Sequence, residues 1–108
     1  ITSDNFGAHS ISSSLSQKIA MMNSTKLTVE GSASVVVWAE TTAIFTTYIP
    51  AGEEQVPVLQ TPAPIPLVAA SSVNGGKVVA VSCAFTFHGT LMRLAPGDND
   101  LFRAIVEW

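Results

Sequence analysis

The sequence contains little charge, few aromatic residues and a single cysteine. Of its 108 residues, 12% are charged, 7% are aromatic, and Cys83 carries the one thiol. One cysteine cannot form a disulfide within the chain or build a cysteine metal cluster, so packing alone must hold the fold. Intrinsic disorder is also excluded, because disordered chains have low hydrophobicity, whereas 47% of these residues are hydrophobic.

Basic residues are especially scarce. Five Lys and Arg face eight Asp and Glu, which gives a net charge of −3. This charge has the wrong sign to neutralise a phosphate backbone, so we expect no nucleic-acid partner. The sequence also lacks an apolar run of the roughly 20 residues that cross a bilayer, and we expect no membrane insertion.

The length fits one domain, and its hydrophobic content is high for that size. We therefore expect the domain to associate with copies of itself. The first residue is Ile1 rather than Met, so we interpret the chain as a processed product or a fragment. Its localisation is not predicted by any signal in the sequence.

Residues 1–22 are interpreted as an N-terminal arm and residues 23–108 as the folded domain. The stretch from Ile1 to Ser16 is rich in Ser and Thr and has no sustained hydrophobic period, which is typical of an extended segment. Asn23 begins an Asn-Ser-Thr triplet that matches the N-glycosylation pattern. We interpret that triplet as a turn.

Two β-rich segments open the domain. Ala33–Ala39 is a β-branched run that predicts a buried strand, and Ile44–Ile49 predicts a second one. Prolines then recur at positions 57, 62, 64 and 66, and proline removes backbone donors from a sheet. We therefore expect residues 50–66 to form a long loop with edge pieces.

A turn signal at Asn74-Gly75-Gly76 predicts a hairpin between Leu67–Val73 and Lys77–His88. The second strand of this hairpin alternates with period two. Its expected core face contains Val79, Val81, Cys83, Phe85 and Phe87. Thr86 and His88 fall on the expected outer face.

The last part of the chain is read as further strands, Thr90–Leu94 and Leu101–Trp108. On the final strand, Leu101 and Ile105 would lie on the face opposite Phe102 and Val106. Apolar residues on an outer face indicate a subunit interface. Short strands separated by turns then predict an all-β fold, a jelly-roll β-sandwich with an extended N-terminal arm.

No arrangement of residues predicts catalysis or metal binding. A Gly-x-Ser-x-Gly nucleophile elbow is missing, and Cys83 and His88 would lie on opposite faces of one strand. His9 and His88 are too few ligands for a metal site. The oxygen-rich run Gly97–Asp100 could attract Ca²⁺, but we interpret it as a turn that caps backbone amides. We expect no enzyme activity, no cofactor and no metal.

Several blocks of the sequence support a resemblance. They are Phe45-Thr46-Thr47-Tyr48, Leu67-Val68-Ala69 with Val73 and Gly76, the block from His88 to Leu94, and the closing Ala104-Ile105-Val106-Glu107-Trp108. Together they resemble the tumour necrosis factor-like jelly roll, and especially the trimeric fucose-binding N-terminal domain of a bacterial superlectin.

The resemblance implies a carbohydrate site between neighbouring subunits. Thr47 and Tyr48 match a Thr-Tyr pair that holds the sugar in that family, and His88 stands where the family has an Arg. A Ser-Thr-x-Arg stretch of the family has no counterpart in the proline-rich loop. The ligand-binding residues implied are therefore Tyr48, Thr47 and His88.

Two functions follow as expectations. The first is a lectin-like homotrimer that binds a carbohydrate, such as a fucoside, at its intersubunit sites. The second is a structural protein, such as a decoration or spike subunit of a virion, which works through protein–protein contacts. The sparse charge and the apolar outer face suit both functions.

Overall fold

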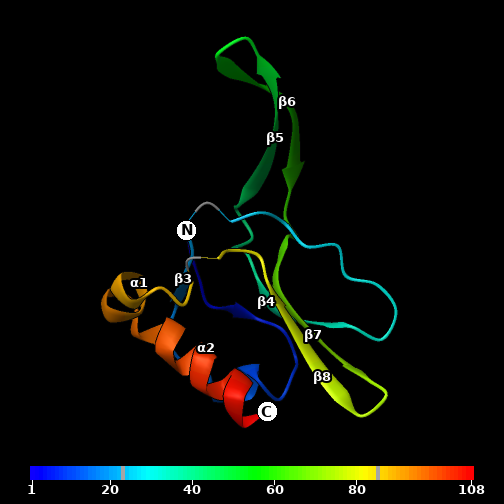
Figure 1. Cartoon of the computed structure of the whole chain (residues 1–108), viewed down its shortest axis with the longest axis vertical. Helices are drawn as coiled ribbons and strands as arrows, with labels where there is room; N and C mark the ends of the chain where they lie inside the picture. The colour runs from blue at the N-terminus through cyan, green and yellow to red at the C-terminus, as the bar shows by residue number, and fades with distance from the viewer. Residues whose placement is uncertain (23, 85) are drawn as a thin grey trace.

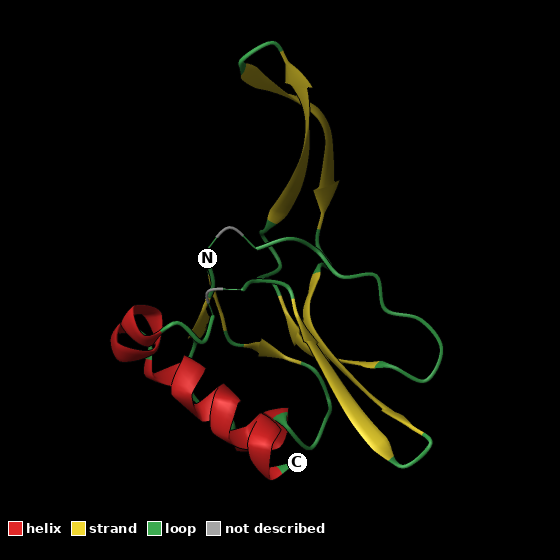
Figure 2. Ribbon diagram, in the orientation of Figure 1, coloured by secondary structure: helices red, strands yellow, loops and turns green. Residues whose placement is uncertain are grey.

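The computed structural model describes residues 1–22, 24–84 and 86–108. Two sequence interpretations, the turn at Asn23 and the core position of Phe85, lie outside these residues. The described chain forms three small antiparallel sheets and ends in two helices (Figures 1 and 2). Among the described residues, no helix is long and apolar enough to span a membrane.

The elements follow one another in a simple order. They are β1 (Thr2–Ser3), β2 (Asn5–Phe6), the 3₁₀ helix η1 (Ser12–Ser14), β3 (Ile19–Ala20), β4 (Ser34–Trp38), β5 (Ile44–Ala51), β6 (Glu54–Pro62), β7 (Pro66–Val73), β8 (Gly76–Val81), α1 (Gly89–Leu94) and α2 (Pro96–Glu107). The main sheet has the order β2-β4-β7-β8, while β1 pairs with β3 and β5 pairs with β6.

The predicted all-β jelly roll is wrong. The described sheets do not close into a sandwich, and the C-terminal fifth of the chain is helical. In Figure 2 both helices lie together beside the N-terminal strands, on one side of the main sheet. The structure is a mixed α/β fold with a two-stranded hairpin projecting from it.

The strand predicted at Leu101–Trp108 is helix α2. Pro96 stands at its first helical position, where the missing N–H is not needed, and Asp98 lies in its first turn. The buried residues Gly97, Asp98, Leu101 and Ala104 recur at helical spacing. The predicted two-faced alternation is consequently wrong, because Leu101 is 0% exposed while Phe102 and Val106 are exposed.

The strand predicted at Thr90–Leu94 is helix α1. His88 is its N-cap, with Nδ1 accepting a hydrogen bond from the Thr90 amide at 3.3 Å. This cap satisfies one of the amides that a helix leaves unpaired at its start. Gly89 therefore begins a helix where the sequence suggested an interruption between strands.

The predicted strands β4 and β5 and the hairpin of β7 and β8 are confirmed. Asn74 and Gly75 adopt positive φ angles of 49° and 79° in the connecting turn. However, β8 ends at Val81, so the strand expected to continue to His88 is too long. The predicted core residues Val79, Val81, Cys83 and Phe87 do lie in the core or pack against it. Thr86 is buried, and its Oγ1 donates a hydrogen bond to the Cys83 carbonyl at 3.1 Å.

The loop predicted for residues 50–66 is largely strand. β5 continues through Pro50, and β6 runs over nine residues despite Pro57 and Pro62. The two strands form a separate ribbon, so neither is a central strand that must donate hydrogen bonds on both sides. Proline is tolerated there for that reason.

The core is built from both ends of the chain. The N-terminal segment contributes Ile11, Leu15, Ile19 and Met21, which pack with residues of β4, β7 and α2. The helix α2 touches this segment closely, because a Cβ added at Gly97 would lie 2.1 Å from the Lys18 carbonyl oxygen. The four-stranded sheet supplies the opposite wall of the core.

Asp98 joins the two ends of the chain. Its side chain is 0% exposed, and Oδ1 accepts a hydrogen bond from the Ala20 amide at 2.7 Å. Oδ2 has no partner among the described residues. Burial raises the pKa of this carboxyl from 3.8 to about 6, although the hydrogen bond from Ala20 lowers it.

Candidate protein interaction surface

The projecting hairpin consists of β5, β6 and the turn between them, residues 44–62. It extends away from the rest of the molecule in Figure 1. Eight residue pairs connect the strands, from Ile44 opposite Pro62 to Ala51 opposite Glu54. Gly52 turns the chain with a φ of 67°, and glycine adopts this left-handed conformation without steric cost.

Pairing assigns the residues of the hairpin to two faces, because directly opposed residues share a face and successive residues alternate. One face carries Phe45, Ile49, Val56 and Leu59, with Thr47, Thr61, Ala51 and Glu54. The other carries Ile44, Tyr48 and Pro57, with Thr46, Gln60, Pro50, Gln55 and Pro62. The register shifts between Thr47 and Tyr48, which leaves Val58 as the extra residue of a bulge.

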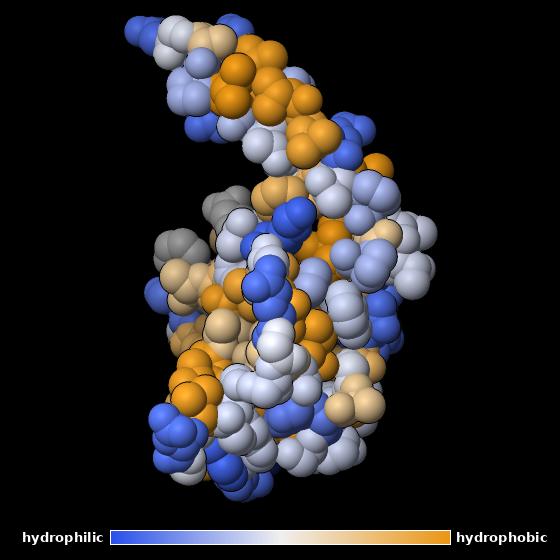
Figure 3. All heavy atoms as spheres, turned by 90° about the vertical axis from the view of Figure 1, so that its right-hand side faces the viewer, coloured by the Kyte–Doolittle hydropathy of each residue, from blue (hydrophilic) through white to orange (hydrophobic). Residues whose placement is uncertain are grey.

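Large apolar side chains are exposed on both faces of the hairpin. Of the thirteen exposed large hydrophobic residues that the structure describes, six belong to it: Ile44, Tyr48, Ile49, Val56, Val58 and Leu59. Leu59 is the most exposed of them, at 60%. Figure 3 shows a band of hydrophobic atoms along the face of the hairpin that is turned to the viewer. Contiguous exposed apolar surface of this kind marks an interaction site.

The hairpin has almost no charge. Residues 41–52 and 55–76 contain no charged side chain, so the acidic pair Glu53 and Glu54 in the turn is isolated at the tip. A partner surface for the two strands must therefore be apolar, since buried unpaired charges are costly. The acidic tip must remain in water or contact a positively charged group of the partner.

The base of the hairpin is fixed to the core. The Ala63 amide donates to the Ala43 carbonyl at 3.2 Å, and the Ala39 amide donates to the carbonyl of the buried Ile65 at 2.8 Å. The Lys26 ammonium lies 5.7 Å from the centre of the Phe45 ring, which is within cation–π range. The hairpin is thus held at one end.

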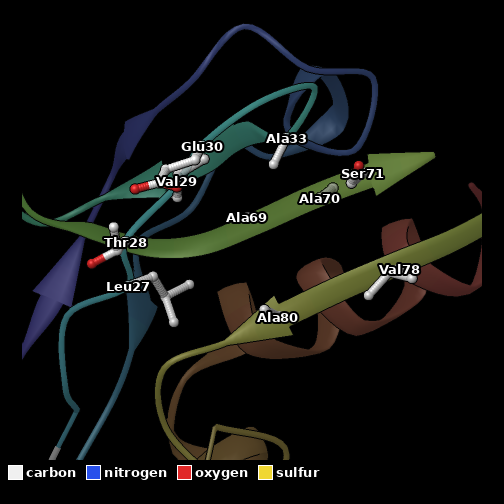
Figure 4. A pocket seen from close by; sticks show the side chains of 10 residues that line it. All are labelled: Leu27, Thr28, Val29, Glu30, Ala33, Ala69, Ala70, Ser71, Val78 and Ala80. Carbon is white, nitrogen blue, oxygen red and sulfur yellow. The ribbon is translucent and has the colours of Figure 1, made fainter. Parts of the chain in front are cut away.

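A groove of about 540 Å³ lies beside the main sheet. Residues 27–30 and Ala33 form one wall, β8 contributes Val78 and Ala80, and Ala69, Ala70 and Ser71 of β7 lie between them (Figure 4). Glu30 is its one charged lining residue. The groove is therefore a second largely apolar feature of the surface, and it is concave.

The residues implied by the resemblance lie apart within one chain. Thr47 and Tyr48 belong to β5 in the projecting hairpin, whereas His88 caps α1, which is distant from that hairpin in Figure 1. Tyr48 is 52% exposed. The structure does not bring these residues together in one molecule, and the site between subunits stays a prediction.

The remaining reactive groups have structural contacts. Cys83 is buried, and its Sγ donates to the Met22 carbonyl at 2.7 Å. The His9 ring packs edge-on against Trp108, with 4.9 Å between the ring centres. Across residues 1–22, 24–84 and 86–108, no three His, Cys, Asp or Glu residues form a group that could hold a metal ion.

The hairpin was not predicted from the sequence as an interaction surface. Leu101 and Ile105, where an interface was predicted, are buried and half-buried in α2. A signal for the hairpin was present, because two uncharged β-rich segments flank Gly52 and the acidic pair. The prolines of β6 concealed that signal.

Comparison with known proteins identifies no relative. No family model, no curated protein and no solved structure matches this chain.

Proposed function

We propose that this chain is a structural assembly protein without catalytic activity, which associates with copies of itself into a homotrimer through the projecting hairpin. One observation supports this most directly: a ribbon outside the core exposes six large hydrophobic side chains. A decoration or spike subunit of a virus particle is an example of such a protein.

The physical argument concerns the stability of the ribbon. A two-stranded hairpin without further packing is only marginally stable in water, and this hairpin is fixed only at its base. Burying a large apolar side chain completely contributes about 1.5–3 kcal/mol. Covering the side chains of the hairpin would stabilise both the ribbon and the complex. A closed cyclic assembly would hide this surface on every copy.

The test compares two leucines with similar exposure. Leu59 is 60% exposed on the hairpin, and Leu94 is 76% exposed at the end of α1. Light scattering should give the wild type and Leu94→Glu three times the 11.3 kDa mass of one chain. Leu59→Glu should be monomeric at micromolar concentration, because it places a charge in the apolar contact. A monomeric wild type, or assembly of Leu59→Glu, would contradict the proposal.

A carbohydrate-binding module is the second candidate, and one observation favours it. Tyr48 presents a half-exposed ring on the hairpin, and an aromatic ring can stack on a sugar while its hydroxyl donates a hydrogen bond. In a trimer, His88 of another copy could complete the site. Titration of fucosides into the wild type, Tyr48→Ala and His88→Ala should then show weak binding that both variants lose. Equal binding by all three would exclude this site.

A further inference from the structure

We infer that the projecting hairpin of one copy docks in the groove of a neighbouring copy, so that assembly proceeds by hairpin-into-groove contacts. This inference rests on the proposed self-association and names the surface that receives the hairpin. The two features match in kind, because one is a convex apolar ribbon and the other a concave apolar trough. Each chain has both, so each copy can donate one contact and accept another.

The occupant must come from another chain. The hairpin leaves the body at a base fixed by the hydrogen bond between the buried residues Ala39 and Ile65, and it points away from the sheet in Figures 1 and 3. The groove lies beside the main sheet, between residues 27–33 and the strands β7 and β8. A hairpin anchored this way does not fold back into the groove of its own chain. The hairpin of a second copy can approach that groove from outside, because no covalent connection limits its position.

The area of the hairpin favours a groove over a flat contact. Eight paired rows of a two-stranded ribbon are about 27 Å long and about 10 Å wide, so one face covers roughly 270 Å². A standard interface buries about 800 Å² on each partner. Two hairpins packed face to face would fall well short of that area. A hairpin set in a groove contacts the walls as well, and each copy makes this contact twice.

The charges determine which part of the hairpin enters. Glu30 lines the groove, and Glu53 and Glu54 lie at the tip, so the tip would be repelled if it stopped inside. The uncharged middle of the ribbon, with Ile49, Val56 and Leu59, is therefore the part that fits. Its exposed side chains can pack against Val78 and the alanines of the trough, while the tip extends beyond it into water.

Matched valines test the groove. Val78 lines it and is 58% exposed, whereas Val73 lies outside it in the same β7–β8 hairpin and is 54% exposed. Sedimentation velocity should show that Val78→Glu raises the concentration needed for assembly by more than about tenfold. Val73→Glu should assemble like the wild type. Equal assembly of the two variants would overturn docking in the groove, even if Leu59→Glu remained monomeric and the proposed function stood.

Mixing two defective variants sharpens the test. Leu59→Glu keeps an intact groove, and Val78→Glu keeps an intact hairpin. In a mixture, the hairpin of Val78→Glu should therefore dock in the groove of Leu59→Glu. The resulting pair cannot bind a third chain, because its remaining hairpin and its remaining groove are both defective. Such pairs would have twice the 11.3 kDa mass of a single chain, while each variant alone stays monomeric. A mixture that remains monomeric at concentrations where the wild type assembles would contradict the inference. Full assembly of Val78→Glu by itself would show that the hairpin binds elsewhere.

Discussion

Leu101 of α2 and Leu59 of β6 carry the same side chain in opposite surroundings. Leu101 is fully buried between the helix and the N-terminal segment, whereas Leu59 is 60% exposed on the projecting hairpin. The body of the molecule gains stability from packing among distant segments. The hairpin has only the pairing of its two strands and a fixed base. The apolar residues of the hairpin therefore add little to the packing of the single chain, which supports the proposal that they serve association.

Two glycines should show this difference most strongly. In the body, a Cβ on Gly97 would collide with the backbone of Lys18, at 2.1 Å from its oxygen and 2.7 Å from its carbon. Gly97→Ala should therefore cost more than about 4 kcal/mol of folding free energy, in the class of exceptional mutations. Gly52 in the hairpin turn has open space around it, and Gly52→Ala should cost only the 1–2 kcal/mol or so of a left-handed backbone.

Urea denaturation measures both glycine variants. If Gly97→Ala were as stable as Gly52→Ala, the close packing of α2 on the N-terminal segment would be wrong. Circular dichroism of Gly97→Ala provides an independent check, because loss of this packing should also reduce the helix signal.

The leucine pair gives the next largest effect. Leu101→Ala should destabilise the fold by about 2–5 kcal/mol, because it removes a buried side chain and leaves a cavity. Leu59→Ala should change the stability of the single chain by less than about 0.5 kcal/mol, measured at concentrations where the protein is monomeric. Similar losses for the two variants would contradict the distinction between body and hairpin.

Asp98 makes the stability of the body depend on pH. Its folded pKa of about 6 lies above the ordinary 3.8, so the folded state binds the proton more tightly than the unfolded state. Stability therefore falls as pH rises through the window between these values, by about 3 kcal/mol in total. The gain from protonation is complete below pH 4 and lost above about pH 6.

Asp98→Asn isolates this contribution. The amide keeps an oxygen that can accept from Ala20 but does not titrate. The wild type should gain stability relative to Asp98→Asn as pH falls from 8 to 3, measured by urea denaturation at each pH. A constant difference between the two proteins over that range would show that burial of the carboxyl has no energetic consequence.

The sequence predicted the strands better than the helices. Ala33–Ala39 and Ile44–Ile49 were identified by their β-branched residues, and the turn at Asn74 by residues that accept positive φ. Helix α2 was missed because Leu101–Trp108 also fits a period of two when read alone. Pro96 at the helix start and buried residues at positions 97, 98, 101 and 104 carry the helical signal.

The candidate site could be predicted only in part. The sequence indicated an apolar surface for self-association, but placed it on α2, because exposure depends on which segments pack together. The carboxyl of Asp98 in a first helical turn is visible in the sequence, whereas its contact with Ala20 is not. The groove likewise depends on residues 27–33 crossing β7, a contact that no local pattern encodes.

The hydrogen bond between Ala20 and Asp98 spans 78 residues, which has a consequence for the order of folding. Contacts between distant residues close large loops and form slowly, whereas a hairpin forms within about 1–10 μs. The β5–β6 and β7–β8 hairpins can therefore form while the ends of the chain are still apart. We predict that the N-terminal segment and α2 complete the core in a later step, and that Ile11, Ile19 and Leu101 stay exposed to solvent until then.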